Sequence, residues 1–183
     1  MKKLGEKVLY EGEWIVLKEL HLQDEQGEEL HWETIHRVEH TIGLIIIARL
    51  QPSDRVVLIR QYRPALNNYI IGFPAGIADS DDLGREALRE LREETGYHGQ
   101  VIDISPELRS NPALSSDRVF IVSAIIDEEE EQNQHPRQDL EPSEEIEVML
   151  VARDQVREFL LEQHQQGDEI GIAPWLLFGL SLE

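Results

Sequence analysis

Four glutamates on one predicted helix have the residue type and spacing for metal chemistry. Glu86, Glu90, Glu93 and Glu94 lie at positions i, i+4, i+7 and i+8, so in a helix their carboxylates share roughly one face. Four like charges repel one another and weaken the helix unless something positive neutralises them. Carboxylate oxygens are the ligands that Mg²⁺ and Mn²⁺ prefer. The spacing therefore predicts a divalent metal site, and a solvated face paired with the interleaved arginines is the alternative.

The helix that must position these glutamates is predicted over residues 83–95. Leu83, Ala87, Leu88 and Leu91 form an apolar stripe with helical spacing. Acidic residues at 81–82 precede the stripe and favour a helix start, because the N-terminus of a helix attracts negative charge. A glycine at position 96 follows and is a natural C-terminal stop.

Apolar runs predict the strands around this helix. Residues 8–38 indicate a β-meander with a turn at 24–27, and further strands are predicted at 41–48, 55–60, 69–73, 119–126 and 146–151. Helices are predicted at 154–166 and 174–182. The polar, acidic stretch 127–143 is predicted to be a mobile loop, of a length often found in functional lids. This order indicates mixed α/β layers, with a small β-rich domain at 1–40 and a main domain at 41–183.

Composition excludes several classes of function. The chain has 183 residues, 37 acidic against 17 basic, no cysteine and 40% hydrophobic residues. Disulfides, thiolate metal sites and cysteine nucleophiles are therefore excluded, as is global disorder. The net charge of −20 argues against a nucleic-acid partner, because phosphate contacts need a basic face. No apolar run approaches the roughly 20 residues that span a bilayer, and residues 1–6 are no signal peptide, so we expect a cytoplasmic protein with no membrane partner.

The segment from Gly76 to Tyr97 resembles the Nudix box. That pattern runs Gly, five residues, Glu, seven residues, then Arg-Glu-apolar-any-Glu-Glu-any-Gly-apolar, and Arg89–Tyr97 matches the second half without exception. The first half is one residue shorter than in the family, and its acidic position is Asp81 or Asp82. The resemblance implies an α/β (α+β) fold, the Nudix α/β/α sandwich, here with the small N-terminal β-domain.

This resemblance also implies a metal site. Glu90 and Glu94 would be the principal ligands, Glu93 would assist, the backbone carbonyl of Ala75 would complete the site, and Arg89 would orient the carboxylates. The implied cofactor is Mg²⁺, with Mn²⁺ as an alternative. Such an ion neutralises a pyrophosphate and activates water for attack on phosphorus.

Segments outside the box resemble the ADP-ribose pyrophosphatase and nucleoside diphosphate sugar hydrolase branch of the family. Residues 60–64 and 73–76 match its strand and loop, although Gly72 stands where that branch has a glutamate. Pro112 lies 16 residues after Gly96, the spacing associated with ADP-ribose hydrolysis, and an ordinary turn proline is the alternative. The substrate-binding residues that the resemblance implies are Trp32, Arg37, Arg60, Arg63, Pro112, Leu114 and Arg118. Pairing with surface acids is the alternative for the arginines.

Residues 1–40 resemble the appendage through which these enzymes form swapped homodimers. A homodimer is therefore implied, in which Trp32 or Trp14 stacks on the base of the substrate. Packing within the dimer interface is the alternative for both tryptophans. His36 and His40 are spaced by four but lie in or beside a predicted strand, so we interpret them as incidental.

The resemblance further implies a general base on a mobile loop, here at residues 139–147. The candidates are Glu141, Glu144 and Glu145, and the first two are preferred because Glu145 can be paired within the following strand.

The predicted function is Mg²⁺-dependent cleavage of ADP-ribose or another nucleoside diphosphate sugar to a nucleoside monophosphate and a sugar phosphate. One alternative is a non-catalytic Nudix-fold nucleotide sensor, which the shortened box loop suggests. The other is a Nudix hydrolase that acts on other nucleotides or on RNA ends, against which the acidic surface counts.

Overall fold

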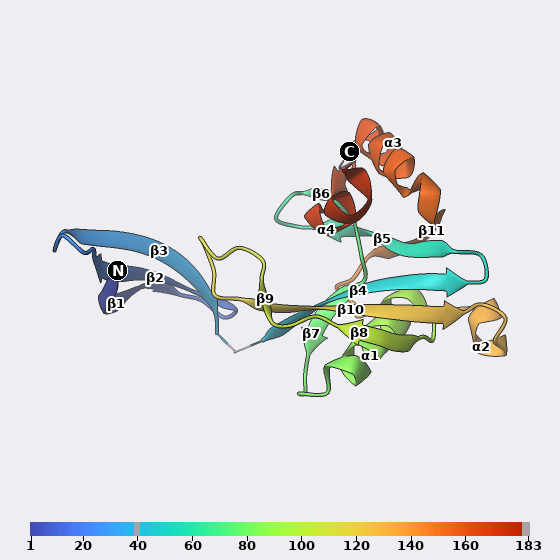
Figure 1. Cartoon of the computed structure of the whole chain (residues 1–183), viewed down its shortest axis with the longest axis horizontal. Coiled ribbons are helices and arrows are strands. Elements are labelled where there is room, and N and C mark those ends of the chain that lie inside the picture. Colours follow the sequence, from blue (N-terminus) through green and yellow to red (C-terminus); the bar gives the residue numbers. More distant parts are fainter. Residues whose placement is uncertain (39–40, 181–183) are drawn as a thin grey trace. The chain divides into compact units, whose positions relative to one another are not determined.

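The computed structural model describes residues 1–38 and 41–180, which form two compact units (Figure 1). Unit 1 comprises Met1–Gly43 and Pro106–Phe120, and unit 2 comprises Leu44–Ser105 and Ile121–Glu183. The domain boundary predicted at residue 40, His40 itself and the end of the helix predicted to reach residue 182 lie outside the described residues.

Unit 1 is built on an antiparallel meander, as the sequence predicts. Its strands are β1 (Lys2–Glu11), β2 (Ile15–Gln23) and β3 (Glu29–Arg37), in the order β1-β2-β3. The β2–β3 turn forms because the Asp24 carboxylate accepts hydrogen bonds of 2.9 Å from the backbone N–H groups of Gln26 and Glu28. Gly27 adopts φ +91° there, a conformation that side chains disfavour. Most residues of this sheet are exposed.

Residues 106–120 belong to unit 1, although the sequence assigns them to the main domain. The Trp32 indole N–H donates to the carbonyl oxygen of Ala113 at 2.8 Å. The Thr34 hydroxyl and the Ile35 backbone N–H both donate to the carbonyl oxygen of Leu114 at 2.8 Å. The short strand β9 (Leu108–Arg109) pairs with the start of β10 (Arg118–Asp127). The hydrogen bonds from Trp32 and Thr34 join segments about 80 positions apart, and local sequence patterns do not predict contacts at such a separation.

Unit 2 contains the large sheet. Its strands are β4 (Ile42–Gln51), β5 (Arg55–Arg63), β6 (Asn68–Gly72), β7 (Ala75–Ala78), β8 (Gln100–Ile104), β10, β11 (Ile146–Ala152) and β12 (Glu169–Ile170). The order is β12-β6-β5-β4-β10-β8, with β11 paired to β5 and β7 paired to β4. The strands predicted from apolar runs are confirmed.

Helices cover both faces of this sheet (Figure 1). Helix α1 (Leu83–Thr95) lies on one face, and α3 (Val156–Gln166) and α4 (Ile172–Pro174) lie on the other. The short segment η1 (Arg153–Gln155) leads directly into α3, and η2 (Trp175–Gly179) follows α4 and contacts α3. The alternate residues Leu44, Ile46, Ala48 and Leu50 of β4 are buried, while Ile45 and Ile47 pack against the core beneath α3. The fold is therefore the expected α/β/α sandwich. Within residues 1–38 and 41–180, none of the helices has the length and apolar character that crossing a bilayer requires.

Helix α1 has the predicted bounds because both ends are capped. The Asp82 carboxylate accepts from the Arg85 backbone N–H at 3.2 Å, which satisfies a free donor of the first turn. Gly96 adopts φ +77°, and its N–H donates to the Arg92 carbonyl at 2.7 Å. A side chain at position 96 would also meet the backbone of Arg137 at 2.3 Å.

The segment between β10 and β11 is held more firmly than the sequence predicts. It contains a short helix, α2 (Glu131–Gln134), in which the buried Asn133 exchanges hydrogen bonds of 2.8 and 2.9 Å with the backbone of His98. The Gln138 side-chain amide donates to the Glu94 carbonyl at 2.6 Å, and the Asp139 N–H donates to the Glu93 carbonyl at 2.9 Å. The predicted mobile loop is thus tied to the C-terminal end of α1 as far as residue 139.

Candidate active site

The innermost carboxylate of the site is that of Glu94. This residue is 2% exposed, and its Oε2 accepts a 2.8 Å hydrogen bond from the Ala75 backbone N–H. Burial raises the pKa of Glu94 to about 8, although the hydrogen bond from Ala75 opposes that shift. A buried carboxylate with a raised pKa needs a positive charge beside it to be fully ionised at neutral pH. The position therefore suits a cation ligand.

Glu90 lies one helical turn before Glu94 and packs against strand β7 at Gly76. A Cβ atom built on Gly76 would lie 2.0 Å from the Glu90 Cδ, so glycine is required for this close approach. Burial raises the pKa of Glu90, and its ion pair with Arg89 acts in the opposite direction. The strand–loop–helix junction thus brings the Glu90 and Glu94 carboxylates and the backbone of Ala75 together.

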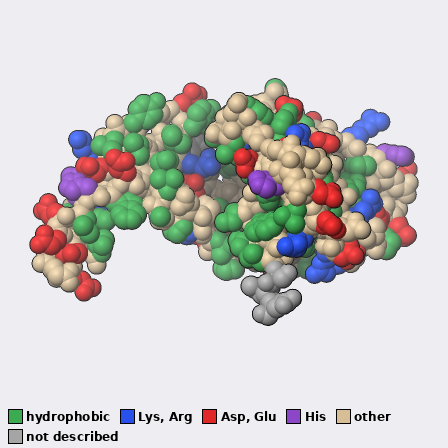
Figure 2. Space-filling view, turned by 90° about the horizontal axis from the view of Figure 1, so that it is seen from above, with side chains coloured by type: hydrophobic (Ala, Val, Ile, Leu, Met, Phe, Trp, Pro, Cys, Tyr) green, Lys and Arg blue, Asp and Glu red, His purple; other side chains and the backbone are tan. Residues whose placement is uncertain are grey.

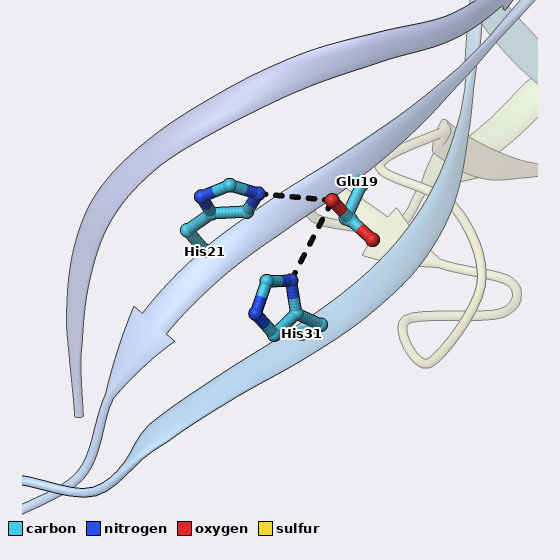
Figure 3. Close-up of side chains that lie close together, drawn as sticks. All are labelled: Glu19, His21 and His31. Carbon is cyan, nitrogen blue, oxygen red and sulfur yellow. Dashed lines mark hydrogen bonds and ion pairs between the residues drawn. The ribbon is translucent and has the colours of Figure 1, made fainter.

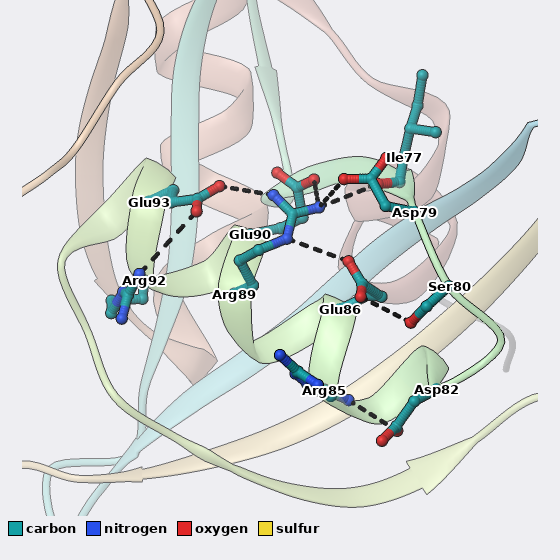
Figure 4. A network of polar contacts seen from close by, with 10 residues as sticks. All are labelled: Ile77, Asp79, Ser80, Asp82, Arg85, Glu86, Arg89, Glu90, Arg92 and Glu93. Carbon is teal, nitrogen blue, oxygen red and sulfur yellow. Dashed lines mark hydrogen bonds and ion pairs between the residues drawn. The ribbon is translucent and has the colours of Figure 1, made fainter.

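Arg89 is the centre of an ion-pair network on the exposed side of this junction (Figure 4). Its guanidinium donates to Glu93 at 2.7 Å, to Glu90 at 2.8 Å and to Glu86 at 3.1 Å. A further N–H donates to the Ile77 carbonyl at 3.2 Å. One arginine therefore offsets the repulsion among three carboxylates and fixes their directions.

Glu86, the first glutamate of the helix, has a different role from Glu90 and Glu94. The Glu86 carboxylate accepts from the Ser80 hydroxyl at 2.7 Å as well as from Arg89. These hydrogen bonds lower the pKa of Glu86. Glu86 and the capping Asp82 hold the box loop against the start of α1 (Figure 4). The loop that is one residue short thus closes onto the helix through its own polar side chains.

The three loop glutamates differ in their surroundings. The Glu145 carboxylate accepts a hydrogen bond from the hydroxyl of Tyr69, a residue of β6. The charge of Glu144 contributes to the rise of the pKa values of both Glu90 and Glu94, so Glu144 lies within electrostatic range of the helix carboxylates. Its side chain also accepts from the Glu141 backbone N–H at 2.9 Å. The identity of the general base stays a prediction, and Glu144 has the best position among the three.

The donor set fits a divalent metal. Two carboxylates on one helical face, a third from Glu93 at the edge and the Ala75 carbonyl supply hard oxygen ligands, which Mg²⁺ and Mn²⁺ favour. Two observations support this fit. The close cradle at Gly76 leaves no space for a side chain, and the Glu94 carboxylate is buried without an arginine or lysine hydrogen-bonded to it among the contacts described.

The predicted phosphate-binding arginines of unit 2 separate into two environments. Arg63, at the end of β5, acts electrostatically on Glu94, where its positive charge partly opposes the rise of the pKa that burial causes. Arg60 makes two hydrogen bonds to the buried Asp168, at 2.7 and 2.9 Å, and its guanidinium lies 3.7 Å from the centroid of the Tyr69 ring. The sequence analysis predicted neither partner of Arg60. Asp168 lies 108 positions from Arg60, a separation that no local pattern bridges. Arg63 is thus the better-placed phosphate ligand.

The other predicted substrate-binding residues lie in unit 1. The segment with Pro112 and Leu114 is held by Trp32 and its neighbours on β3, as described above. Arg37 pairs with Asp117 at 3.8 Å, and Arg118 pairs with Glu107 at 3.6 Å. These residues therefore share one unit, and their roles stay predictions.

In this fold, carboxylates of helix α1, the backbone of strand β7 and the charge of a flanking loop glutamate come together at one site. Residues 39–175 match the NUDIX domain, and the chain belongs to the Nudix hydrolase family.

Two curated proteins and one solved structure are similar to this chain over most of its length. The chain is 31% identical to the ADP-ribose pyrophosphatase of Saccharomyces cerevisiae, over 84% of this chain and 71% of that protein. It is 30% identical to the ADP-sugar pyrophosphatase of Mus musculus, over 98% of this chain and 86% of that protein. A crystal structure of an ADP compounds hydrolase superposes with a TM-score of 0.68 at 19% identity, covering 88% of this chain and 84% of that one. That last likeness shows the fold alone.

Proposed function

We propose that this protein is a Mg²⁺-dependent pyrophosphohydrolase that cleaves ADP-ribose or a related nucleoside diphosphate sugar. The products would be a nucleoside monophosphate and a sugar phosphate. The observation that carries the proposal is the meeting of Glu90, Glu94 and Ala75 at Gly76. The names of the relatives in yeast and mouse support the substrate class.

Each group in unit 2 has a defined task in this proposal. Glu90, Glu94 and the Ala75 carbonyl would hold the metal, with Glu93 assisting, and Arg89 would fix the directions of the carboxylates. When bound, the ion supplies charge neutralisation of the pyrophosphate and a more acidic water. Glu144 accepts the proton of the attacking water, and the Arg63 guanidinium stabilises negative charge on the phosphates.

We also propose that unit 1 mediates a homodimer. Several large apolar side chains of unit 1 are exposed, among them Val8, Tyr10, Trp14, Ile15 and Leu30. Hydrophobic side chains (green) lie at the surface of this unit in Figure 2. Exposed apolar surface of this kind is typical of association sites.

The test of the activity is a substrate panel. Purified protein is incubated with Mg²⁺ and ADP-ribose, ADP-glucose or GDP-mannose, and the products are identified by chromatography and mass spectrometry. We expect AMP and ribose phosphate from ADP-ribose. Hydrolysis in water labelled with ¹⁸O then shows which phosphorus is attacked. If no member of the panel is cleaved while a known Nudix enzyme turns over in parallel, the proposal is wrong, and tight binding without products would indicate a sensor.

A further inference from the structure

The β2–β3 hairpin of unit 1 carries a second group of potential metal ligands, far in sequence from the Nudix box. His21 pairs with His31 across the two strands, and Glu19 pairs with Glu33 two residues further along. Side chains two apart on a strand point to the same face. The register therefore places two imidazoles and two carboxylates together on one face of the hairpin.

Three of these side chains converge on one point (Figure 3). The Glu19 Oε1 lies 2.9 Å from His21 Nε2 and 3.5 Å from His31 Nδ1. The two imidazole centroids are 4.6 Å apart, and one ligand atom from each residue lies within 4.8 Å of the others. Ligand atoms about 2.0–2.1 Å from a tetrahedral Zn²⁺ are about 3.3 Å from one another. The measured separations from Glu19 lie on either side of that value, so small side-chain rotations suffice to admit an ion.

The face is open to solvent at this point. The exposed fractions of the Glu19, His21 and His31 side chains are 27%, 43% and 54%. On the neighbouring strand β1, Gly5 stands opposite His21, and nothing lies within 4 Å of a Cβ built there. Histidine side chains (purple) lie at the surface of this unit beside acidic ones (red) in Figure 2. A metal ion can therefore enter directly, and water or Glu33 can complete its coordination.

The ligand types determine which ion fits. Imidazole nitrogen suits Zn²⁺, Ni²⁺ and Cu²⁺, whereas Mg²⁺ is a hard cation that prefers oxygen. The ring nitrogens of neutral imidazole are common ligands of these ions. Because two of the three ligands are imidazoles, the hairpin is suited to a transition metal rather than to the cofactor of the Nudix site. Lys7 stands opposite Glu19 in the β1–β2 register, and its positive charge weakens the binding of any cation.

We propose that Glu19, His21 and His31 bind a Zn²⁺ ion or a chemically similar transition-metal dication. The ion bridges β2 and β3 and so stabilises the hairpin, because metal ligation favours the folded arrangement of its ligands. This site is separate from the Nudix box, and its occupancy does not depend on the proposed hydrolase activity.

The direct test is Zn²⁺ titration of the full-length wild-type protein with Mg²⁺ kept in large excess, followed by NMR of the imidazole resonances. We expect the His21 and His31 signals to shift together at substoichiometric Zn²⁺, before those of the other histidines. Mg²⁺ alone should leave both unchanged. This measurement needs no variant, so it does not depend on the folding of a mutant. Uniform shifts of all histidines, or none at His21 and His31, would overturn the proposal.

Variants then assign the ligands through a competition assay with a fluorescent zinc chelator. His21→Gln and His31→Gln should each weaken the hairpin site at least about tenfold, a loss of about 1.4 kcal/mol. The matched control is His98→Gln, which removes an exposed histidine of unit 2 and should bind as tightly as wild type. Circular dichroism confirms that each variant is folded. Equal Zn²⁺ affinity in the hairpin variants and the control would contradict the assignment.

Discussion

The Glu94 carboxylate accepts a 2.8 Å hydrogen bond from the Ala75 backbone N–H, and this contact ties helix α1 to the start of strand β7. The two residues lie 19 positions apart. The contact places the Glu94 side chain and the Ala75 peptide at one point, where side-chain and main-chain oxygens of the metal site are proposed to converge.

Replacement of Glu94 by Gln should abolish activity and leave the fold intact. Glutamine keeps the volume of the side chain but removes the negative charge that a metal ligand needs, so we expect kcat/KM to fall about 10³-fold or more. Product formation from ADP-ribose measures this loss. The matched control is Glu158→Gln, at an exposed position of α3, which should keep wild-type activity. A Glu94→Gln enzyme with near-normal turnover would show that this carboxylate is not a ligand.

Replacement of Gly76 by Ala should weaken metal binding more than stability. The added methyl group would occupy the space of the Glu90 carboxyl carbon, 2.0 Å away, and would push that flexible side chain out of position. We expect the Mg²⁺ concentration for half-maximal activity to rise at least about tenfold, as for other changes that misdirect a metal ligand.

The control for Gly76→Ala is Gly72→Ala, because a Cβ at Gly72 meets nothing within 4 Å. Its Mg²⁺ dependence should match that of wild type. Equal Mg²⁺ dependence of the Gly76→Ala enzyme and wild type would show that Glu90 does not contribute to the site.

Among the loop glutamates, Glu144 should be the one whose loss affects turnover most. Its charge acts on Glu90 and Glu94, whereas Glu145 accepts from Tyr69. Loss of a general base lowers rate by about 10²–10⁴-fold, so Glu144→Gln should lower kcat by that factor with little change in KM. Glu141→Gln, three residues away, serves as the matched control. A larger loss in Glu141→Gln or Glu145→Gln would move the base to that residue.

Removal of divalent metal should make stability decrease as pH rises. The pKa of Glu94 is raised from 4.5 to about 8 by burial, so between these values the folded state binds more protons than the unfolded state. The free energy of unfolding of the metal-free protein therefore falls across this range, by several kcal/mol at about 1.4 kcal/mol per pKa unit.

Thermal unfolding in EDTA, from pH 5 to pH 8.5, measures this effect. Because other acidic groups also titrate, the informative quantity is the difference between wild type and Glu94→Gln, which lacks the titrating carboxyl. Wild type should lose more stability than the variant as pH rises, and saturating Mn²⁺ should reduce that difference. Parallel pH profiles in EDTA would contradict the assigned burial effect.

A charge at an exposed apolar position of β1 should convert the proposed dimer to a monomer. Val8 is exposed on this strand, and a glutamate there would place an unpaired charge in an apolar interface, which is costly. Light scattering after gel filtration should give twice the chain mass for wild type and the single-chain mass for Val8→Glu. Ile102→Glu, at an exposed position of unit 2, should remain dimeric. A monomeric wild type would contradict the proposed dimer.

The sequence alone determined the local features of this protein. Helix α1 has the predicted bounds because its apolar stripe, Asp82 and Gly96 act within a few residues of one another. The strands of the sandwich follow from apolar runs for the same reason. The glutamates proposed as metal ligands could also be predicted from the sequence, since their spacing on one helix is a local property.

Tertiary structure decided which distant residues meet. Residues 106–120 join unit 1 through hydrogen bonds to β3, and Arg60 is engaged by Asp168. The segment predicted as a mobile loop is held by Asn133 and Gln138. The Glu-x-His and His-x-Glu patterns of the hairpin are visible in the sequence, but the strand register brings Glu19, His21 and His31 together. Contacts between distant segments depend on packing and register, which no short stretch of sequence specifies.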